Sequence, residues 1–394
     1  MLLLIAFTGV SQTSLKYFDS LTYRQYMDGR YKELLISGKE ALDNGHDYYY
    51  LRMRLGIANY ELKRFGEAAL QFNAAMNMSL DATSAEYYYY SLVYAGRTNE
   101  ARIFLCSNRE LLSKVPGKCS DPLSGTFIEG GLKWSDGKVR EIGTISFLHA
   151  GLQHLLHPRW EIYQGYTRTH QELYSFTYGS GGMGNGPGPG GSGDSVEYRE
   201  NVSLDQNEYY ARVSYFTAKG LELSPAFHFQ SVVGLDNNYA GSLRLSKRFT
   251  YVLVSASAAY SRISQLDQQL YGIKAVIYPR GDINLYLGGE LNYHVQSDGN
   301  WVYVLNGGVQ ITNALWLQGM YGGGQMFNYA DMHAFYLYNI PDVINTRFNI
   351  MAILRIAGRH LLQAGYLYEK KNQIETGTDY RHRGLYLGLT LNLQ

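Results

Sequence analysis

The chain has 394 residues, and its 35 Lys and Arg residues nearly balance 34 Asp and Glu residues, for a formal net charge of +1. The basic residues form no stripe, so the charge gives no electrostatic basis for a nucleic-acid partner. The 37 tyrosines and 43 glycines exceed the usage of an ordinary globular domain and suit a curved, membrane-facing sheet. Near residue 122 charged helical sequence gives way to Gly- and aromatic-rich alternation, which predicts two domains.

Residues 1–12, MLLLIAFTGVSQ, form a short apolar stretch that ends in polar sequence. This pattern predicts a secretory signal peptide, although no Lys or Arg precedes the apolar run. The alternative is an N-terminal helix docked on a soluble domain. At roughly ten residues the run is too short to span a bilayer. No other segment resembles a transmembrane helix, so we expect any membrane insertion to occur through strands.

Residues 18–120 are predicted to form a helical domain built from repeated helix pairs. Similar segments begin at Gly29, Lys63 and Gly96, at spacings of 34 and 33 residues. This spacing is the period of tetratricopeptide repeats, or TPRs. We expect the first copy to lack most of its leading helix. The middle copy matches throughout, and its small or apolar packing positions are Leu55, Gly56, Ala68, Phe72 and Ala75.

Two tyrosine runs, 48–50 and 87–90, stand out in this domain. Tyr49 and Tyr88 are candidates for a concave face that binds a protein partner. The alternative is that these rings only pack the helices together. Three repeats are near the minimum for a stacked solenoid, so we expect the domain to lean on the second domain or on a partner.

The two cysteines, Cys106 and Cys119, lie where the helical sequence ends. In an oxidising compartment they could form a disulfide that joins the last helix to the start of the second domain. The alternative is a pair of buried free thiols. Their spacing does not match a metal site, and we expect no metal.

Residues 124–394 alternate between apolar and small or polar side chains. In the last strand Leu385, Leu387 and Leu389 alternate with Tyr386 and Gly388, and similar segments recur about every twenty residues back to residue 126. Repeated period-two segments with no long apolar run are typical of an antiparallel transmembrane β-barrel. The fold class is therefore α + β with two domains: TPR-like helix pairs followed by a barrel.

The connections between these segments are of two kinds. Tight turns fall at 157–158, 219–220, 247–248, 279–282, 312–313 and 359–360, and they alternate with longer connections at about 136, 177–203, 236, 265, 297, 325–345 and 372–381. Six turns and seven loops give about 14 strands, with both barrel ends on the short-turn side. The extended segment 331–338 then belongs to a long outer loop. The count becomes 16 only if this segment pairs and one further strand has been missed.

A barrel of this size is expected to be open inside, since about 8 strands are filled by side chains and about 16 leave an aqueous channel. A loop could still plug the lumen. The inward candidates carry both signs of charge: Glu129, Lys133, Arg212, Lys274, Glu290, Arg347 and Arg355, with Glu222 and Glu369 of the same kind. Mixed charge favours ion pairs in the lumen or a neutral polar solute over a strongly ion-selective pore.

Several motifs offer little chemistry. The glycine-rich stretch 179–193 lacks the Lys-Ser or Lys-Thr of a phosphate-binding loop and is expected to be an outer loop. His149, His154, His157 and His170 show no metal-ligand spacing, and we expect them on the surface or the rim. Ser261 and His294 could be imagined as an outer-face catalytic pair, but no catalytic motif supports them. We expect no cofactor and no enzymatic activity.

A signal sequence, a few TPR-like repeats and a Gly- and Tyr-rich barrel resemble the YaiO family of outer-membrane barrels. More loosely, the order of domains is similar to the export porins for cellulose, poly-N-acetylglucosamine and Pel polysaccharide. The chain departs from these exporters in its shorter helical array and in its final residues, Leu393 and Gln394, where an aromatic residue usually stands.

This resemblance implies a barrel in the outer membrane of a Gram-negative bacterium, in contact with its lipid, with the TPR domain in the periplasm. Its expected role is export or assembly of a cell-surface polysaccharide or protein, with a periplasmic protein bound by the helices. The alternative is a non-conducting structural or adhesive anchor whose extracellular loops bind a surface partner.

Overall fold

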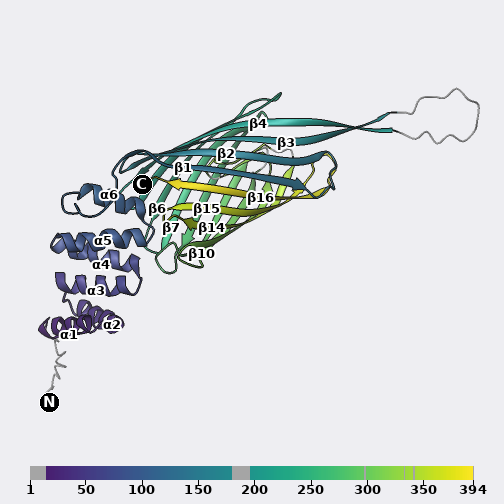
Figure 1. Cartoon of the computed structure of the whole chain (residues 1–394). Coiled ribbons are helices and arrows are strands. Elements are labelled where there is room, and N and C mark those ends of the chain that lie inside the picture. Colours follow the sequence, from purple (N-terminus) through teal and green to yellow (C-terminus); the bar gives the residue numbers. More distant parts are fainter. Residues whose placement is uncertain (1–14, 180–195, 297–298, 332, 340–341, 394) are drawn as a thin grey trace, which may run out of the picture. The chain divides into compact units, whose positions relative to one another are not determined.

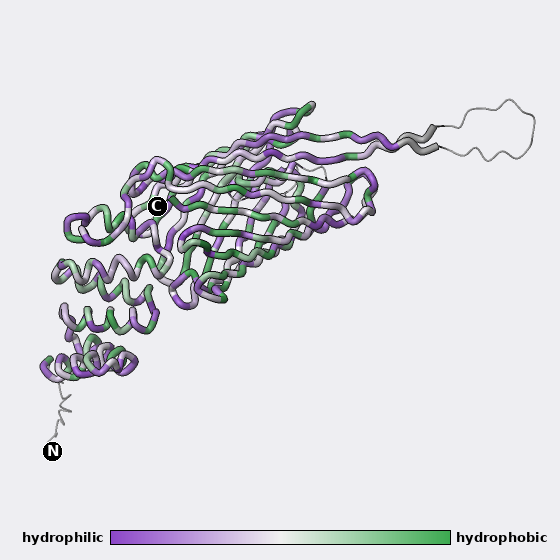
Figure 2. Tube along the Cα trace, viewed as in Figure 1, coloured by the Kyte–Doolittle hydropathy of each residue, from purple (hydrophilic) through white to green (hydrophobic). Residues whose placement is uncertain are grey.

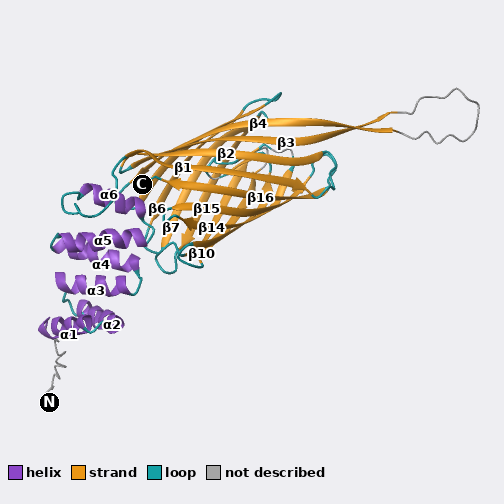
Figure 3. Cartoon of the chain, in the orientation of Figure 1, coloured by secondary structure: helices purple, strands orange, loops and turns teal. Residues whose placement is uncertain are grey.

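The computed structural model describes residues 15–179, 196–296, 299–331, 333–339 and 342–393. The predicted signal peptide and most of the glycine-rich stretch lie outside these residues. Helices occupy a first compact unit that ends at Gly117, and strands occupy a second unit that begins at Lys118. Figures 1 and 3 show the two kinds of structure separated along the chain.

Six helices form three successive pairs: α1 (Leu15–Met27), α2 (Tyr31–Asp43), α3 (Tyr49–Glu61), α4 (Phe65–Met78), α5 (Ala82–Tyr94) and α6 (Thr98–Ser107). The leading helices α1, α3 and α5 begin 34 and 33 residues apart, so the repeat spacing in the sequence is also a structural spacing. The expectation that the first copy lacks its leading helix is wrong, since α1 has 13 residues. Its Phe18 is fully buried and packs in one cluster with Leu34 and Leu51, although the Leu-Gly signature is missing.

Small residues let the helices approach closely. A Cβ atom on Gly56 of α3 would lie 2.5 Å from Cε1 of Phe72 in α4, and a Cβ atom on Gly38 would lie 2.5 Å from Cδ2 of Leu55. Phe72 is fully buried, and its ring stacks on Tyr87 at 5.1 Å. The five packing positions expected from the sequence are all buried: Leu55, Gly56, Ala68, Phe72 and Ala75.

The second unit is a closed barrel of 14 antiparallel strands, as the alternation of turns and loops predicts. Its strands are β1 (Asp121–Ser135), β2 (Ile142–His157), β3 (Trp160–Gly179), β4 (Val196–Phe216), β5 (Leu221–Val232), β6 (Asn238–Arg248), β7 (Val252–Ile263), β8 (Leu266–Ile277), β9 (Leu285–Val295), β10 (Gly299–Gln310), β11 (Leu315–Met326), β14 (Val343–Ile356), β15 (His360–Asn372) and β16 (Asp379–Asn392). Pairing of β1 with β16 closes the ring and leaves no free edge along the paired segments.

The two rims of the barrel differ. Gly125 of β1 pairs with Asn392 of β16, so the barrel begins and ends at one rim, and all six predicted tight turns lie there. We call this the tight-turn rim and the opposite one the long-loop rim. The predicted loop at 177–203 is shorter than expected, because β3 runs to Gly179 and β4 begins at Val196.

Side chains alternate between the two faces of the barrel wall, and Figure 2 shows the alternating hydropathy along the strands. Outward positions hold large exposed apolar residues, such as Leu387 at 64% and Ile273 at 63% exposure. Inward positions include buried polar residues, such as Asn292 and Gln268. A wall so apolar outside and polar inside is the pattern of a barrel that crosses a membrane. None of the described helices is long and apolar enough to cross one.

The contact between α3 and α4 gives a first prediction. Gly56→Ala should lower the stability of the helical unit by about 1 kcal/mol, because crowding Phe72 costs more than the helix propensity gained. Urea unfolding of the full chain in detergent, followed by helical circular dichroism, measures this change. The exposed variant Lys39→Ala is the control, and an unchanged midpoint for Gly56→Ala would contradict the close packing.

Candidate functional site

The connection between β11 and β14 folds back into the barrel. We call residues 327–342 the inner loop; its described part contains a two-stranded sheet of β12 (Tyr329–Ala330) and β13 (Leu337–Tyr338). Asp331 holds its tip, since Oδ1 accepts hydrogen bonds from the backbone N–H of Phe335 at 2.7 Å and of His333 at 3.3 Å. The sequence correctly assigns segment 331–338 to a connection and not to a strand of the wall. The expectation of an outer loop is wrong, because the segment contacts inward side chains of β5 and β14.

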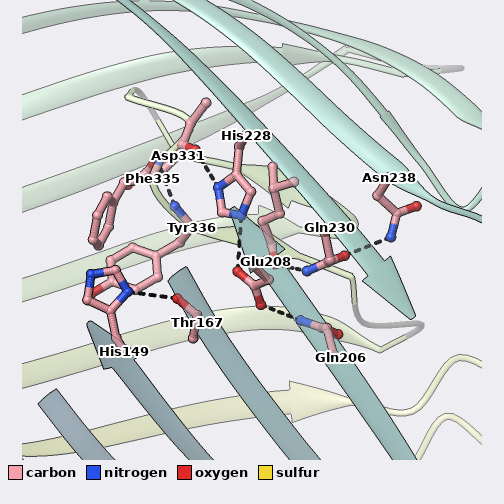
Figure 4. A network of polar contacts seen from close by, with 12 residues as sticks. His149, Thr167, Gln206, Glu208, His228, Gln230, Asn238, Asp331, Phe335 and Tyr336 are labelled. Carbon is pink, nitrogen blue, oxygen red and sulfur yellow. Dashed lines mark hydrogen bonds and ion pairs between the residues drawn. The ribbon is translucent and has the colours of Figure 1, made fainter. Parts of the chain in front are cut away.

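One side of the inner loop contacts the wall formed by β2 to β5. The Phe335 ring lies 5.5 Å from the ring of His149, 6.1 Å from Tyr163 and 4.9 Å from Tyr210, measured between centroids. The backbone oxygen of Ala334 accepts a hydrogen bond from Nδ1 of His228 at 2.8 Å. Figure 4 shows His149 and His228 beside the loop segment that carries Phe335 and Tyr336.

The other side of the inner loop contacts β9 and β14. The Arg347 guanidinium of β14 lies over the rings of Tyr336 and Tyr338, at 5.5 and 5.0 Å from their centroids. Asn292 of β9 donates a hydrogen bond to the Tyr329 hydroxyl at 3.2 Å. In the 14-strand ring β5 and β14 are seven strands apart, so they face each other across the lumen. The inner loop therefore bridges the lumen.

The loop is also packed by apolar contacts and fastened at its end. Ala330, Ala334 and Leu337 are buried against Ala240 of β6 and Ile263 of β7. Beyond this cluster, the Tyr380 hydroxyl of β16 donates to Oδ2 of Asp342 at 2.5 Å. The inner loop is thus held in place both by a small hydrophobic cluster and by hydrogen bonds to the barrel wall.

A buried carboxylate organises the wall beside the loop. Glu369 of β15 is fully buried, and its oxygens lie 3.0 Å from Nζ of Lys133, 3.3 Å from Nζ of Lys371 and 3.7 Å from Nε of Arg347. Because Arg347 also contacts the loop tyrosines, this ion cluster positions the side chain that holds the loop on the β14 side. Removing the carboxylate would leave three cations close together in a poorly solvated space.

All seven lumen candidates lie on the inward register, as their strand partners show: Glu129, Lys133, Arg212, Lys274, Glu290, Arg347 and Arg355. Lys274 and Glu290 pair at 3.8 Å, and Arg212 lies 5.8 Å from the centroid of the Tyr163 ring. Glu222 likewise pairs with Arg244 at 2.5 Å. Lys133, Lys274, Glu290 and Arg347 therefore take part in ion pairs, whereas Arg212 and Arg355 lie over aromatic rings.

Sequence reasoning missed the buried histidines. His149 is not a rim residue: it is buried in the lumen, where Nδ1 lies 2.7 Å from the Thr167 hydroxyl and Nε2 lies 2.7 Å from the Tyr163 hydroxyl. Ser261 and His294 are buried on the inner face, not the outer one. Among the described residues no group of three or more His, Cys, Asp or Glu side chains has the geometry to hold a metal ion.

The two tyrosine candidates of the helical unit take part in packing. The Tyr49 hydroxyl donates to Asp81 at 2.6 Å, and the Tyr88 ring meets Phe104 edge-on at 4.7 Å. The next residue in α3, Tyr50, is the one whose side chain is exposed, at 65%. Cys106, at the end of α6, and Cys119, just before β1, are disulfide-bonded.

Comparisons with known proteins concern the fold alone. No protein-family model and no curated protein matches the chain. Among solved structures it is similar to a mutant of the TodX monoaromatic hydrocarbon channel, at a TM-score of 0.44 and 10% identity over 73% of this chain and 94% of that one. It is also similar to a bacterial polysaccharide outer membrane secretin (TM-score 0.39, 8% identity, 70% of this chain and 100% of that one). A third is the translocator domain of the autotransporter NalP from Neisseria meningitidis (TM-score 0.33, 11% identity, 76% and 98%). Identities this low transfer no substrate.

The ion cluster gives a second prediction. Glu369→Gln should destabilise the barrel by about 3–5 kcal/mol, because buried cations lose their counter-charge. The measurement is the temperature at which the folded barrel loses its compact mobility on an SDS gel. Glu375→Gln, at an exposed position in the β15–β16 connection, is the matched control, and equal temperatures for the two variants would refute the role of the cluster.

Asp81 gives a third prediction, for the helical unit. Its side chain caps α5 by accepting from the backbone N–H groups of Thr83 and Ser84. Burial alone would raise the pKa of Asp81, but hydrogen bonds from the Tyr49 hydroxyl and the Ser84 backbone outweigh it and hold the pKa below its usual value. A lowered folded-state pKa contributes stability that is present above the unfolded pKa, about 4, and is lost as the pH falls through the folded one.

Asp81→Ala should therefore cost about 1 kcal/mol near pH 7, because the cap is lost. The difference from the wild type should shrink at an acidic pH below the lowered folded-state pKa, where the wild-type carboxylate itself is protonated. Urea midpoints of the helical circular dichroism signal at the two pH values measure this. A difference that stays constant with pH would show that the charge of Asp81 is irrelevant.

Proposed function

We propose that the chain is an outer-membrane barrel of a Gram-negative bacterium that takes part in export or assembly of a cell-surface polysaccharide or protein. In this proposal the inner loop closes the lumen at rest, and the helical pairs bind a periplasmic protein. The observation that carries it is the bridge from His228 on β5, through the loop, to Arg347 on β14. The proposal includes no enzymatic step and no cofactor.

The sidedness of the proposal follows from the connections. Outer-membrane barrels have short periplasmic turns and longer extracellular loops. Because β1 begins and β16 ends at the tight-turn rim, the chain that precedes β1 would leave the membrane on the periplasmic side. The helical pairs would then be periplasmic, and their 34- and 33-residue spacing supports a TPR-like array that binds a partner.

The wall of the lumen suits a neutral polar substrate. Lys274 pairs with Glu290, Arg244 pairs with Glu222, and Glu369 offsets part of the charge of the cations beside it, so the wall carries both signs of charge. Such a wall neither attracts nor repels ions strongly. A polymer could pass only after the inner loop had moved, so we expect a closed state that a partner or substrate opens.

Conductance in planar bilayers is the fourth prediction and tests this proposal. The wild-type protein should conduct rarely, and Phe335→Ala should raise its open probability roughly thirtyfold. The half-buried ring and its contacts with three other rings contribute about 2 kcal/mol to the closed state. Phe348→Ala, which removes a ring from the outer face of β14, is the matched control. A wild-type barrel that is open most of the time would overturn the closed resting state.

The second candidate is a non-conducting anchor whose outer segments bind a surface partner. It is favoured by the β3–β4 hairpin, which stays paired from Trp160 and Tyr215 to Gly179 and Val196, whereas β5 pairs with β4 only as far as Gln206. The hairpin thus continues past its neighbour at the long-loop rim. Silence of both the wild-type protein and Phe335→Ala in bilayers would favour this anchor over the channel.

A further inference from the structure

The two rims carry opposite charge. The six connections at the tight-turn rim contain four basic residues, Arg159, Lys219, Arg280 and Arg359, and one acidic residue, Asp282. The described residues of the long-loop connections other than the inner loop include two basic ones, Lys138 and Arg140, and four acidic ones, Asp136, Glu141, Asp236 and Glu375. The connections at the tight-turn rim are therefore net basic and those at the long-loop rim net acidic, and we ask what the basic residues bind.

Basic residues and aromatic rings are combined in neighbouring tight turns. In the turns at β2–β3 and β4–β5, Nη1 of Arg159 donates to the Tyr215 hydroxyl at 3.3 Å, and the Tyr215 ring lies 4.8 Å from that of Trp160. In the next turn, Nζ of Lys247, near the end of β6, lies 5.6 Å from the centroid of the Phe249 ring.

The turns at β4–β5 and β6–β7 are also joined directly. Nζ of Lys247 donates to the backbone oxygen of Lys219, and the Arg248 backbone N–H donates to the Gly220 oxygen at 2.8 Å. Arg159, Lys219 and Lys247 therefore lie along one continuous stretch of the rim, from β2 to β7. We call these three residues the basic arc.

The basic arc lies where the apolar outer wall ends. Exposed apolar residues adjoin it in all three turns: Trp160 at 44%, Leu221 at 39% and Phe249 at 52% exposure. Aromatic rings next to cations at the end of an apolar wall mark the boundary between hydrocarbon and lipid headgroups. At that depth the groups within reach of a lysine or arginine are lipid phosphates.

We propose that the basic arc binds the phosphate headgroups of anionic phospholipids in the leaflet at the tight-turn rim. The charge of the arc is complementary to that leaflet, and each cation near an anionic surface favours binding about fivefold. The aromatic rings set the depth of the barrel, and the cations select the headgroup. This binding does not require an open lumen, so a silent barrel in bilayer recordings leaves it intact.

Lipid retention by the full-length protein is the fifth prediction and tests this proposal. The protein is reconstituted in nanodiscs of phosphatidylcholine with a minor fraction of phosphatidylglycerol, and the lipids that remain bound after extraction are quantified by mass spectrometry. The wild type should retain phosphatidylglycerol above its bulk fraction. The triple variant Arg159→Gln, Lys219→Gln, Lys247→Gln should lose most of this enrichment.

The matched control is the triple variant Lys138→Gln, Arg262→Gln, Lys370→Gln, which removes three cations at the long-loop rim. It changes the net charge by the same amount and should leave the enrichment intact. Equal loss in the two triple variants would overturn the proposal, as would a wild type that shows no enrichment. Compact mobility on an SDS gel confirms that each variant is folded.

Lipid retention by the wild-type protein at different salt concentrations is a second test, which needs no variant. Enrichment by the wild-type protein should fall as the ionic strength rises, because Lys219 is exposed and Arg159 and Lys247 are only half-buried. Salt at 0.1 M screens such charges within about 10 Å. Enrichment that persists at high salt would mean that apolar contacts select the lipid, and it would refute a role for the cations.

Discussion

The need to pair every backbone N–H and C=O group inside a membrane determines the rest of this structure. Pairing of β1 with β16 meets it, because the ring then has no open edge in the hydrocarbon region. Closure of the ring forces successive side chains to opposite faces. The same alternation that gives lipid an apolar surface therefore places a large set of polar and charged groups in a confined interior, and those groups must find partners there.

The lumen meets this demand with its own side chains. Glu369 attracts cations from β1, β14 and β15, and one of these, Arg347, also contacts the tyrosines of the inner loop. If the loop were removed, His228 would lose its contact with the Ala334 oxygen, and the side chains around His228 would be exposed to water. The bridge across the lumen is thus one result of satisfying the polar interior. Displacing the loop requires another source of hydrogen bonds, such as water or a polar substrate.

The sequence predicts the barrel well because its information is local. Alternation such as Leu385, Tyr386, Leu387 involves only neighbouring residues, and Gly, Pro and charged residues mark the tight turns. The number of strands and the rim at which each turn lies therefore follow from the sequence. Inward registers of Glu129 and Arg212 follow from the same parity. The leading helix of the first repeat was missed because Phe18 fills the core without the expected Leu-Gly signature.

The inner loop could not be predicted in this way, because its position depends on contacts with strands far away in the sequence. Ala334 meets His228 across 106 residues, and no periodic pattern links them. One signal was present: Tyr329, Phe335, Tyr336 and Tyr338 make this connection too aromatic for a solvated outer loop. Aromatic rings in an outer connection of a barrel favour a segment that returns to the interior.

His228 shows how the interior tolerates such a segment. Its Nδ1 faces the Ala334 oxygen and its Nε2 lies 3.1 Å from Oε2 of Glu208, and both partners are acceptors when the carboxylate is ionised. Both contacts can be hydrogen bonds only if a proton lies between imidazole and carboxylate, on either group. In both arrangements the pair is neutral overall, so it avoids the cost of a buried net charge. The contact that holds the loop to β5 is thus continued through the same imidazole to Glu208 of β4, so two strands of the wall support the loop.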